Sequence, residues 1–453
     1  MTTVRASGNG RAGSPLDTLV SGMAADLDRG LVPLRVYNDP DVYRAEMTRI
    51  FGRTWVFVAH ESELPTPGDY VARTIGEDPF IVARDEDGVI RVLFDSCRHR
   101  GTQICAADKG NTSHFRCPYH GWTYNNAGAL VGIPNRKQAY PGLDPAEWGL
   151  LPAPQVECYR GLIFACLDPD TPPLLDHLGD YRWYLDIHLG LAPAGMEVIG
   201  DPHRWLIDAD WKSGAENFAG DSYHTQSLHR SIPEIGLTSK AVAGSAGGSN
   251  DVHVTECSGH STSIRRLDPD QSPFWAYPPE VQALFRDNGL TPEQLDLARR
   301  SVVHTGTVFP NLSLIHLGGT DDPAKPPAAY LSLRQWQPRG PGRMEAWSWV
   351  LVPKGSPEEY KRRALKVAVA TFSPSGNFEQ DDSVVWGRVT RPAGGVFAAK
   401  AGILLNYQMG LPDMSLTREL DGWPGPGVVY DSNLEEGVQR TFFRHWIRMM
   451  SRG

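Results

Sequence analysis

The pattern of hydrophobic and polar positions in the first 170 residues predicts two helices followed by a series of short strands. Helix-like sequence runs from Leu16 to Leu27 and from Pro40 to Phe51. The next segments are rich in β-branched and aromatic residues, are separated by turn signals such as Pro67-Gly68, and cover residues 55–59, 70–74, 80–83, 90–94 and 161–167. Short strands joined by tight turns predict a small antiparallel β domain that ends near residue 170.

The pattern changes after residue 170, where helical stretches mix with strands. Helices are expected over residues 206–218, 291–300, 356–372 and 433–450, and strands over 307–309, 329–336 and 345–352. This mixture predicts an α+β fold in which helices cover an antiparallel sheet. Residues 240–262, rich in Gly, Ser, Ala and His, are expected to form a long loop, either an insertion or a functional lid. We therefore divide the chain into an N-terminal segment, 1–37, that packs on the larger domain, a β domain, 38–169, and the larger domain, 170–453.

Composition narrows the class of protein. The 453 residues include 44 Lys and Arg against 53 Asp and Glu, a net charge of −9, and 41% of them are hydrophobic. This balance excludes a disordered chain and argues against nucleic-acid binding, which needs a basic surface. No apolar run reaches the roughly 20 residues that span a bilayer, and no signal peptide is evident, so we expect a cytoplasmic protein without a membrane partner. In a reducing compartment, Cys and His at short spacing indicate metal binding before disulfides.

A first motif of this kind pairs Cys97-Arg-His99-Arg-Gly101 with Cys117-Pro-Tyr-His120-Gly-Trp122. Two Cys and two His fit either a tetrahedral structural zinc or a Rieske [2Fe–2S] cluster, in which the Cys bind one iron and the His bind the other. Each half contributes one ligand of each type, which favours a cluster with two unlike ends. The remaining alternative is four unrelated residues on buried strands.

A second motif spaces Asp221, His224 and His229 as Asp-x2-His-x4-His, and a carboxylate pair, Asp381-Asp382, follows far downstream. The two histidines lie about 140° apart around a regular helix, so they reach one metal only if the helix ends or distorts between them. Two His and one carboxylate form the facial triad of non-haem Fe(II) oxygenases. His-x4-His alone is more typical of a solvated or capping pair, but an electron-transfer cluster on the same chain favours iron.

With both motifs in place, the chain resembles the large (α) subunit of Rieske non-haem iron aromatic-ring-hydroxylating dioxygenases of the naphthalene dioxygenase type, from about Val36 to Met450. The resemblance implies a small antiparallel β Rieske domain and a larger catalytic domain. It also implies that the cluster ligands are Cys97, His99, Cys117 and His120, and that the iron ligands are His224, His229 and Asp382. By the same resemblance, Asp221 bridges an iron-ligand histidine to a cluster histidine of a neighbouring subunit, and Asn217 lies beside the iron.

The resemblance also implies an activity, namely cis-dihydroxylation of an aromatic ring with O2 in an α3 or α3β3 assembly. Electrons are expected from NAD(P)H through a separate flavin reductase and ferredoxin, and the absence of a Gly-x-Gly-x-x-Gly fingerprint after a strand argues against nicotinamide binding by this chain. Two alternatives remain. One is a Rieske monooxygenase that hydroxylates or demethylates. The other, from a different class, is a Rieske electron carrier or zinc scaffold without oxygenase activity.

The substrate pocket is the least determined feature. Matching family positions implies that it is lined by Asn217, Phe218, Ser222, His304, Gly306, His316, Phe372 and Phe378. The phenylalanines suit a flat aromatic ring. His316, together with Arg265 and Arg266, raises the alternative of an aromatic carboxylate such as a phthalate, because arginine binds carboxylates with two parallel hydrogen bonds. If these charges face solvent instead, a neutral hydrocarbon is expected.

Overall fold

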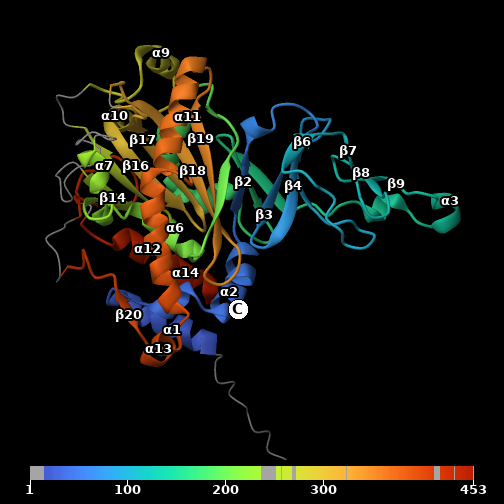
Figure 1. The fold of residues 1–453 in the computed structure, drawn as a ribbon, viewed down its shortest axis with the longest axis horizontal. Helices are drawn as coiled ribbons and strands as arrows, with labels where there is room; N and C mark the ends of the chain where they lie inside the picture. The colour runs from blue at the N-terminus through green and yellow to red at the C-terminus, as the bar shows by residue number, and fades with distance from the viewer. Residues whose placement is uncertain are drawn as a thin grey trace, which may run out of the picture.

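A computed structural model describes residues 15–235, 251–256, 258–267, 272–322, 324–412, 419–432 and 434–451. The N-terminal segment contains α1 (Pro15–Asp28), β1 (Leu31–Pro33) and a 3₁₀ turn, η1 (Leu34–Tyr37), and the chain continues into α2 (Pro40–Glu46) and a π-helical turn, η2 (Met47–Phe51). Strand β1 pairs with β20 (Leu404–Asn406), and α1 packs against α14 (Gly437–Met450). The described part of the N-terminal segment therefore lies against the larger domain, at the lower end of Figure 1.

The small domain is built from short antiparallel strands. One sheet has the order β5-β4-β3-β6, a second β7-β8-β9 and a third β10-β11-β2. Their bounds are β2 (Val56–His60), β3 (Asp69–Ile75), β4 (Asp78–Arg84), β5 (Ile90–Phe94), β6 (Lys109–Asn111), β7 (His114–Arg116), β8 (Thr123–Asn125), β9 (Leu130–Gly132), β10 (Gln155–Tyr159) and β11 (Leu162–Cys166). The domain extends sideways as an arm that ends at β7–β9 and α3 (Arg136–Ala139) (Figure 1).

The larger domain is centred on a long antiparallel sheet with the order β12-β19-β18-β17-β16-β15-β14-β21, and β13 also pairs with β19. Its strands are β12 (Met196–Val198), β13 (His203–Ile207), β14 (Asp251–Thr255), β15 (Ser261–Arg266), β16 (Ser301–Val308), β17 (Leu312–Gly319), β18 (Ala328–Pro338), β19 (Met344–Pro353) and β21 (Val428–Tyr430). The helices around it are α4 (Leu174–Leu178), α5 (Arg182–Leu189), α6 (Trp211–Gly220), α7 (Ser231–Glu234), α9 (Pro279–Gln282), α10 (Pro292–Arg300), α11 (Glu358–Phe372), α12 (Asn377–Ala393) and α13 (Val396–Ala401). None of the helices in the described residues is long and apolar enough to cross a membrane.

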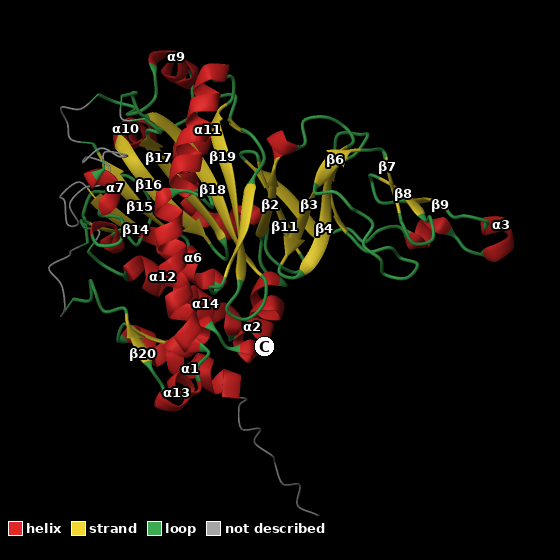
Figure 2. Ribbon diagram, in the orientation of Figure 1, coloured by secondary structure: helices red, strands yellow, loops and turns green. Residues whose placement is uncertain are grey.

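Both faces of this sheet are covered. Helices α6 and α11 pack on one face, which we call the pocket face, with α12 packed on α11 (Figure 2). On the opposite face, which we call the α5 face, His316 stacks on His188 of α5. Because both faces are buried, β17 has no exposed residue at all. The burial pattern of such a strand does not reveal which residues face which side.

Two sequence expectations about this domain are wrong. The helix expected over 206–218 is instead the end of β13, a turn and α6, which begins after Asp210, whose side chain accepts a hydrogen bond from the Lys212 backbone N–H. The described part of the loop expected over 240–262 instead contains β14, in which Val252 and Val254 alternate with polar residues at strand spacing, and the start of β15. Residues 236–250 of that expected loop lie outside the described residues.

Candidate metal centres and substrate pocket

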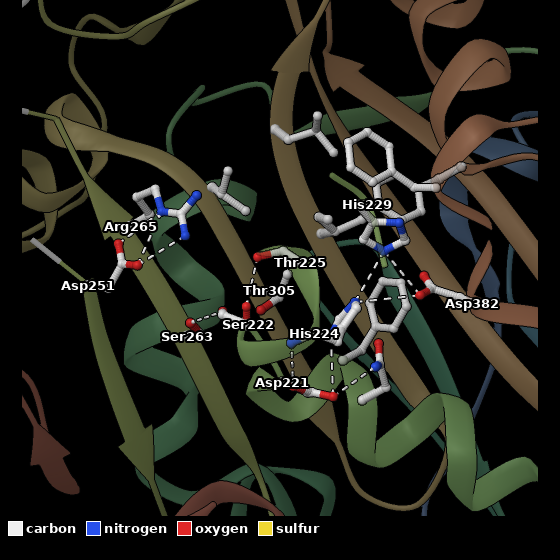
Figure 3. Close-up of a pocket in the computed structure, with 17 residues that line it drawn as sticks. Asp221, Ser222, His224, Thr225, His229, Asp251, Ser263, Arg265, Thr305 and Asp382 are labelled. Carbon is white, nitrogen blue, oxygen red and sulfur yellow. Dashed lines mark hydrogen bonds and ion pairs between the residues drawn. The ribbon is translucent and has the colours of Figure 1, made fainter. Parts of the chain in front are cut away.

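His224, His229 and Asp382 converge in the larger domain (Figure 3). The Nε2 atoms of the two histidines lie 3.2 Å apart. Asp382 Oδ1 is 3.1 Å from His229 Nε2 and 3.5 Å from His224 Nε2. Within the described residues, this is the only group of three or more possible metal donors that lie within 4.8 Å of one another.

A second carboxylate lies beside the outer nitrogen of each histidine. His224 Nδ1 is 3.2 Å from Asp221 Oδ2, and His229 Nδ1 is 3.4 Å from Asp381 Oδ2. Carboxylates in these positions fix the orientation of each ring and point the Nε2 lone pairs at a common centre. The geometry thus separates the adjacent aspartates, because Asp382 faces the centre and Asp381 supports His229.

The donor set fits a divalent iron. Asp382 is 2% exposed, and its Oδ1 has no hydrogen-bond partner although two imidazole nitrogens face it. Burial raises the pKa of Asp382, but the contacts with His224 and His229 outweigh it and lower the pKa to about 2. The carboxylate is therefore anionic at neutral pH, and a two-histidine, one-carboxylate set leaves coordination positions open.

Local structure explains how distant residues meet here. Helix α6 ends at Gly220, His224 lies in a 3₁₀ turn, η6 (Tyr223–Gln226), and His229 follows after that turn has ended. The regular helix is therefore interrupted, as one shared metal requires. Phe378 and Asp382 lie four residues apart on α12 and share a face of that helix. Asn217, near the end of α6, donates from Nδ2 to Asp221 Oδ2 at 3.3 Å, next to the metal-donor set.

The four Cys and His of the first motif lie at the end of the arm, on two loops of matching construction. Gly101 N donates to Cys97 O at 2.8 Å, and Gly121 N donates to Cys117 O at 3.0 Å. Both glycines have positive φ, 77° and 72°, which an L side chain rarely adopts. The loops bring the rings of His99 and His120 to a centroid distance of 4.5 Å.

The spread of these donors distinguishes a cluster from zinc. Four ligands of a tetrahedral zinc, each roughly 2.0–2.3 Å from the ion, lie within about 4 Å of one another. No three of Cys97, His99, Cys117 and His120, all of which the structure describes, meet even the wider limit of 4.8 Å. The Nδ1 atoms of His99 and His120 are buried without a hydrogen-bond partner, as ligand atoms facing an inorganic group would be. The residues therefore fit a [2Fe–2S] cluster better than a zinc ion.

A pocket that is partly open to solvent adjoins the three metal donors and has about 740 Å³ of space when its open mouth is included. Phe372 and Phe378 stack with centroids 5.1 Å apart, and Phe218 packs edge-on against Phe372 at 6.0 Å. The sheet contributes further lining residues, all from its pocket face: Asp251, Ser263, Arg265, Val303, Thr305, Ile315 and Leu317. Asn217 and Ser222 also line it.

Three residues expected in this pocket lie elsewhere. His304, Gly306 and His316 alternate with the lining residues along β16 and β17, so they point to the α5 face. There, His304 Nδ1 is 2.6 Å from His188 Nε2, and His316 Nε2 is 3.0 Å from the Tyr277 hydroxyl. The expectation is wrong because it takes, on each strand, a residue next to one that lines the pocket, and neighbouring residues of a strand point to opposite faces of the sheet. Matching each of the three to its strand neighbour would have found Val303, Thr305 and Ile315.

Of the two arginines considered as carboxylate-binding residues, only Arg265 lines the pocket. Arg265 lines the pocket but pairs with Asp251, which sequence reasoning missed, and Arg266 lies over the Trp423 ring at 5.5 Å, outside the pocket lining. His253 and His260 are buried and hydrogen-bonded to Glu435 and to the backbone oxygen of His177. Asp251 carries no motif, and its role emerges only from strand register.

Comparisons with known proteins agree with this geometry. The family model described as "Rieske [2Fe-2S] domain" matches residues 54–159, and "Ring hydroxylating alpha subunit (catalytic domain)" matches residues 175–452. The chain is 40% identical to N,N-dimethyl phenylurea N-demethylase subunit alpha of Sphingobium sp., over 96% of this chain and 95% of that protein. It is 35% identical to biphenyl dioxygenase subunit alpha of Paraburkholderia xenovorans, over 94% and 92%. The crystal structure of naphthalene 1,2-dioxygenase from Rhodococcus sp. bound to indole aligns with a TM-score of 0.91 and 44% identity, over 97% and 98%.

An arm with a [2Fe–2S] donor set and a helix-covered sheet with a two-histidine, one-carboxylate set define a Rieske non-haem iron oxygenase. The matches extend over nearly the whole chain and include both domains. The chain belongs to the family of ring-hydroxylating dioxygenase alpha subunits. It is an enzyme with a Rieske cluster and a mononuclear iron as cofactors, and it works with a reductase or ferredoxin.

Proposed function

We propose that this enzyme adds both atoms of O2 to one edge of a neutral aromatic ring and so forms a cis-dihydrodiol, with the uptake of two electrons and two protons. The observation that carries the proposal is the position of the two-histidine, one-carboxylate set in the wall of a pocket with three phenylalanines. The similar biphenyl and naphthalene dioxygenases are named for aromatic hydrocarbons.

The proposal assigns the iron to His224, His229 and Asp382, and the cluster to Cys97, His99, Cys117 and His120. When bound, the iron supplies a site for O2 activation and the cluster supplies electrons. The chain itself orients the reactants. Phe372 and Phe378 offer aromatic surface to a flat ring, since aromatic rings favour offset or edge-on contacts.

The proposal further places electron transfer between neighbouring subunits. Within one chain, the cluster loops lie at the end of the arm, on the far side of the small domain from α6 and α12 (Figure 1). A second pocket beside the iron set is lined by Glu216, Tyr407 and Glu436, and Asp221 lines both pockets. Asp221 is therefore in position to link His224 to a cluster histidine of another subunit. This arrangement favours an α3 core, with or without a small β subunit, which light scattering of the purified enzyme would test.

The charge balance of the pocket favours a neutral ring over a phthalate-like acid. Nε of Arg265, a cation in the pocket lining, is 2.9 Å from Oδ1 of Asp251, so the carboxylate already balances the charge of the guanidinium. A carboxylate substrate buried here would face Asp251 as well as Arg265, and a buried charge without a partner costs several kcal/mol.

The decisive experiment is turnover of naphthalene under ¹⁸O2, with a surrogate ferredoxin and reductase supplied with NAD(P)H. Two labelled atoms in a cis-dihydrodiol support the proposal. Loss of product and of mononuclear iron in His224→Ala and Asp382→Ala, with an intact Rieske spectrum, supports the ligand assignment. Incorporation of only one labelled oxygen atom into the product would refute dioxygenation.

N-demethylation is the second candidate, because the Sphingobium relative is named for it. Hydroxylation of an N-methyl carbon inserts one oxygen atom, and the product then releases formaldehyde. Formaldehyde release from an N,N-dimethylated arylurea, without any dihydrodiol from naphthalene, would favour this reaction over the first.

A further inference from the structure

We propose that the end of the substrate pocket away from the iron ligands is a polar subsite, formed by Asp251 and Arg265, that binds a neutral substituent with both a hydrogen-bond donor and an acceptor, such as an amide. The inference rests on the proposed function in one respect: the pocket takes an aromatic substrate. It adds a preference among such substrates.

The two side chains are fixed by strand register. Asp251 on β14 and Arg265 on β15 are direct cross-strand partners, so both point to the pocket face. Arg265 donates from Nε to Oδ1 at 2.9 Å and from Nη2 to Oδ2 at 3.0 Å. Figure 3 shows this pair on one side of the pocket and His224, His229 and Asp382 on the other.

The wall beside the pair is also polar. Ser263 lies two residues before Arg265 on the same face of β15, and its hydroxyl is 3.3 Å from that of Ser222. Thr305 lines the pocket next to them. By contrast, the aromatic residues Phe218, Phe372 and Phe378 come from helices α6, α11 and α12, and α12 also carries Asp382 of the iron set. The pocket therefore has one aromatic end and one hydrogen-bonding end.

A structural role alone does not account for this placement. The side chains of Asp251 and Arg265 are only 6% and 13% exposed, and a buried ion pair adds little stability over apolar residues of similar volume. Apolar residues would also suit Val303, Ile315 and Leu317, which line the same wall. A guanidinium and a carboxylate in such a wall also present several N–H donors and lone pairs from which a substrate can take hydrogen bonds.

The chemistry of the pair selects the substituent. Its guanidinium donates and its carboxylate accepts, whereas the net charge of the pair is zero. A carboxylate substituent would be repelled by Asp251, and an ammonium by Arg265. A hydrocarbon would displace water from both groups and return no hydrogen bond. An amide matches both, with its carbonyl toward Arg265 and its N–H toward Asp251.

The test compares three probes of matched ring size, naphthalene, naphthamide and naphthoate, by equilibrium binding to the oxidised holoenzyme. We expect the parent enzyme to bind naphthamide at least roughly tenfold more tightly than it binds naphthalene or naphthoate. In the double variant Asp251→Leu/Arg265→Met, the affinity ratio of naphthamide to naphthalene should fall at least about tenfold. Asp251→Asn leaves an uncompensated cation, so the preference should shift to naphthoate.

Arg266→Met is the matched control, since Arg266 lies outside the pocket lining, and it should keep the parent ratio. The visible spectrum of the Rieske cluster and the thermal midpoint show whether each variant is folded. A parent enzyme that binds naphthamide no better than naphthalene overturns the subsite even if no variant folds. The proposed function is judged separately by dihydrodiol formation from naphthalene, so either idea can fail alone.

Discussion

Replacement of Lys212 by methionine tests the buried ionic network that fixes α6, the helix that carries Asn217 and leads to Asp221. The Lys212 ammonium is 2.7 Å from Glu46 Oε1 and 2.7 Å from Asp210 Oδ1, and these side chains are at most 4% exposed. Glu46 also accepts hydrogen bonds from the indole N–H groups of two tryptophans. Lys212→Met leaves two buried carboxylates without their cation.

The expected cost is large because one partner of a buried ion pair is removed, which destabilises proteins by about 3–5 kcal/mol. Unfolding entropy is about 2.1 cal/mol/K per residue, so for a chain of this length that cost corresponds to a fall in Tm of about 3–5 °C. Burial raises the pKa of Glu46 to about 7 even though Lys212 opposes the shift. Without Lys212 the pKa of Glu46 rises further. Above pH 7, Glu46 in the folded variant therefore keeps a proton that Glu46 in the folded parent has lost.

The sign of the pH effect follows. A raised carboxyl pKa gives stability that is lost as pH rises, so the deficit of Lys212→Met should grow above pH 7 by up to about 1.4 kcal/mol per pH unit. Differential scanning calorimetry at several pH values measures it. Lys361→Met is the control, because Lys361 pairs with Glu197 and Glu358 at the surface, where such pairs contribute less than about 1 kcal/mol. Equal Tm shifts for the two variants would refute the reasoning.

Three further predictions concern the cluster, the bridge and the α5 face. His99→Cys should lower the reduction potential of the cluster by on the order of 100 mV or lose the cluster, because a thiolate replaces imidazole, whereas the exposed His114→Cys should not change the potential in a redox titration. Asp221→Asn should slow single-turnover product formation by roughly 10–100-fold while the cluster still reduces, and an unchanged rate would contradict the bridging role. Burial lowers the pKa of His304 to about 3 and of His316 to about 4, so the folded state keeps both neutral while the unfolded chain takes up protons below about pH 6.5. As pH falls from 6.5 to 4, the free energy of unfolding should therefore decrease by about 1.4 kcal/mol per pH unit for each histidine. His316→Leu should reduce that slope in urea titrations.

The sequence was most informative where a residue type and its spacing have few structural solutions. The spacing of Cys97 and His99 with a following glycine allows a hairpin tip and little else, and the expected strands of the small domain correspond to observed ones within one or two residues. The choice of Asp382 over Asp381 came from the family pattern. The structure adds the physical reason, because α12 turns Asp382 inward beside Phe378 and leaves Asp381 39% exposed next to His229.

Strand phase was not predictable in the same way. A strand with one exposed face shows alternation, but His304 is fully buried on the α5 face, and its neighbour Val303 is largely covered on the pocket face. Without alternation, a shift of one residue exchanges the two faces, and three pocket residues were assigned to the wrong side. The pairing of Asp251 with Arg265 is likewise a long-range result of sheet register, since the two residues are 14 positions apart in the sequence and no motif joins them.

The charges on the pocket face suggest how the enzyme separates substrate selection from metal binding. Asp382 faces two histidines, Arg334 of β18 pairs with Glu379 of α12, and Arg265 pairs with Asp251. Arg334 and Arg265 are therefore each balanced by a carboxylate on the same face, whereas Asp382 faces the two histidines of the iron set. A pocket built this way has little electrostatic preference for an ion, and it selects by shape at the phenylalanines and by hydrogen bonds at the polar end. His224, His229 and Asp382 would hold Fe(II), which would supply the site for O2 activation, while the charges of Arg334 and Arg265 are balanced by carboxylates of the protein itself.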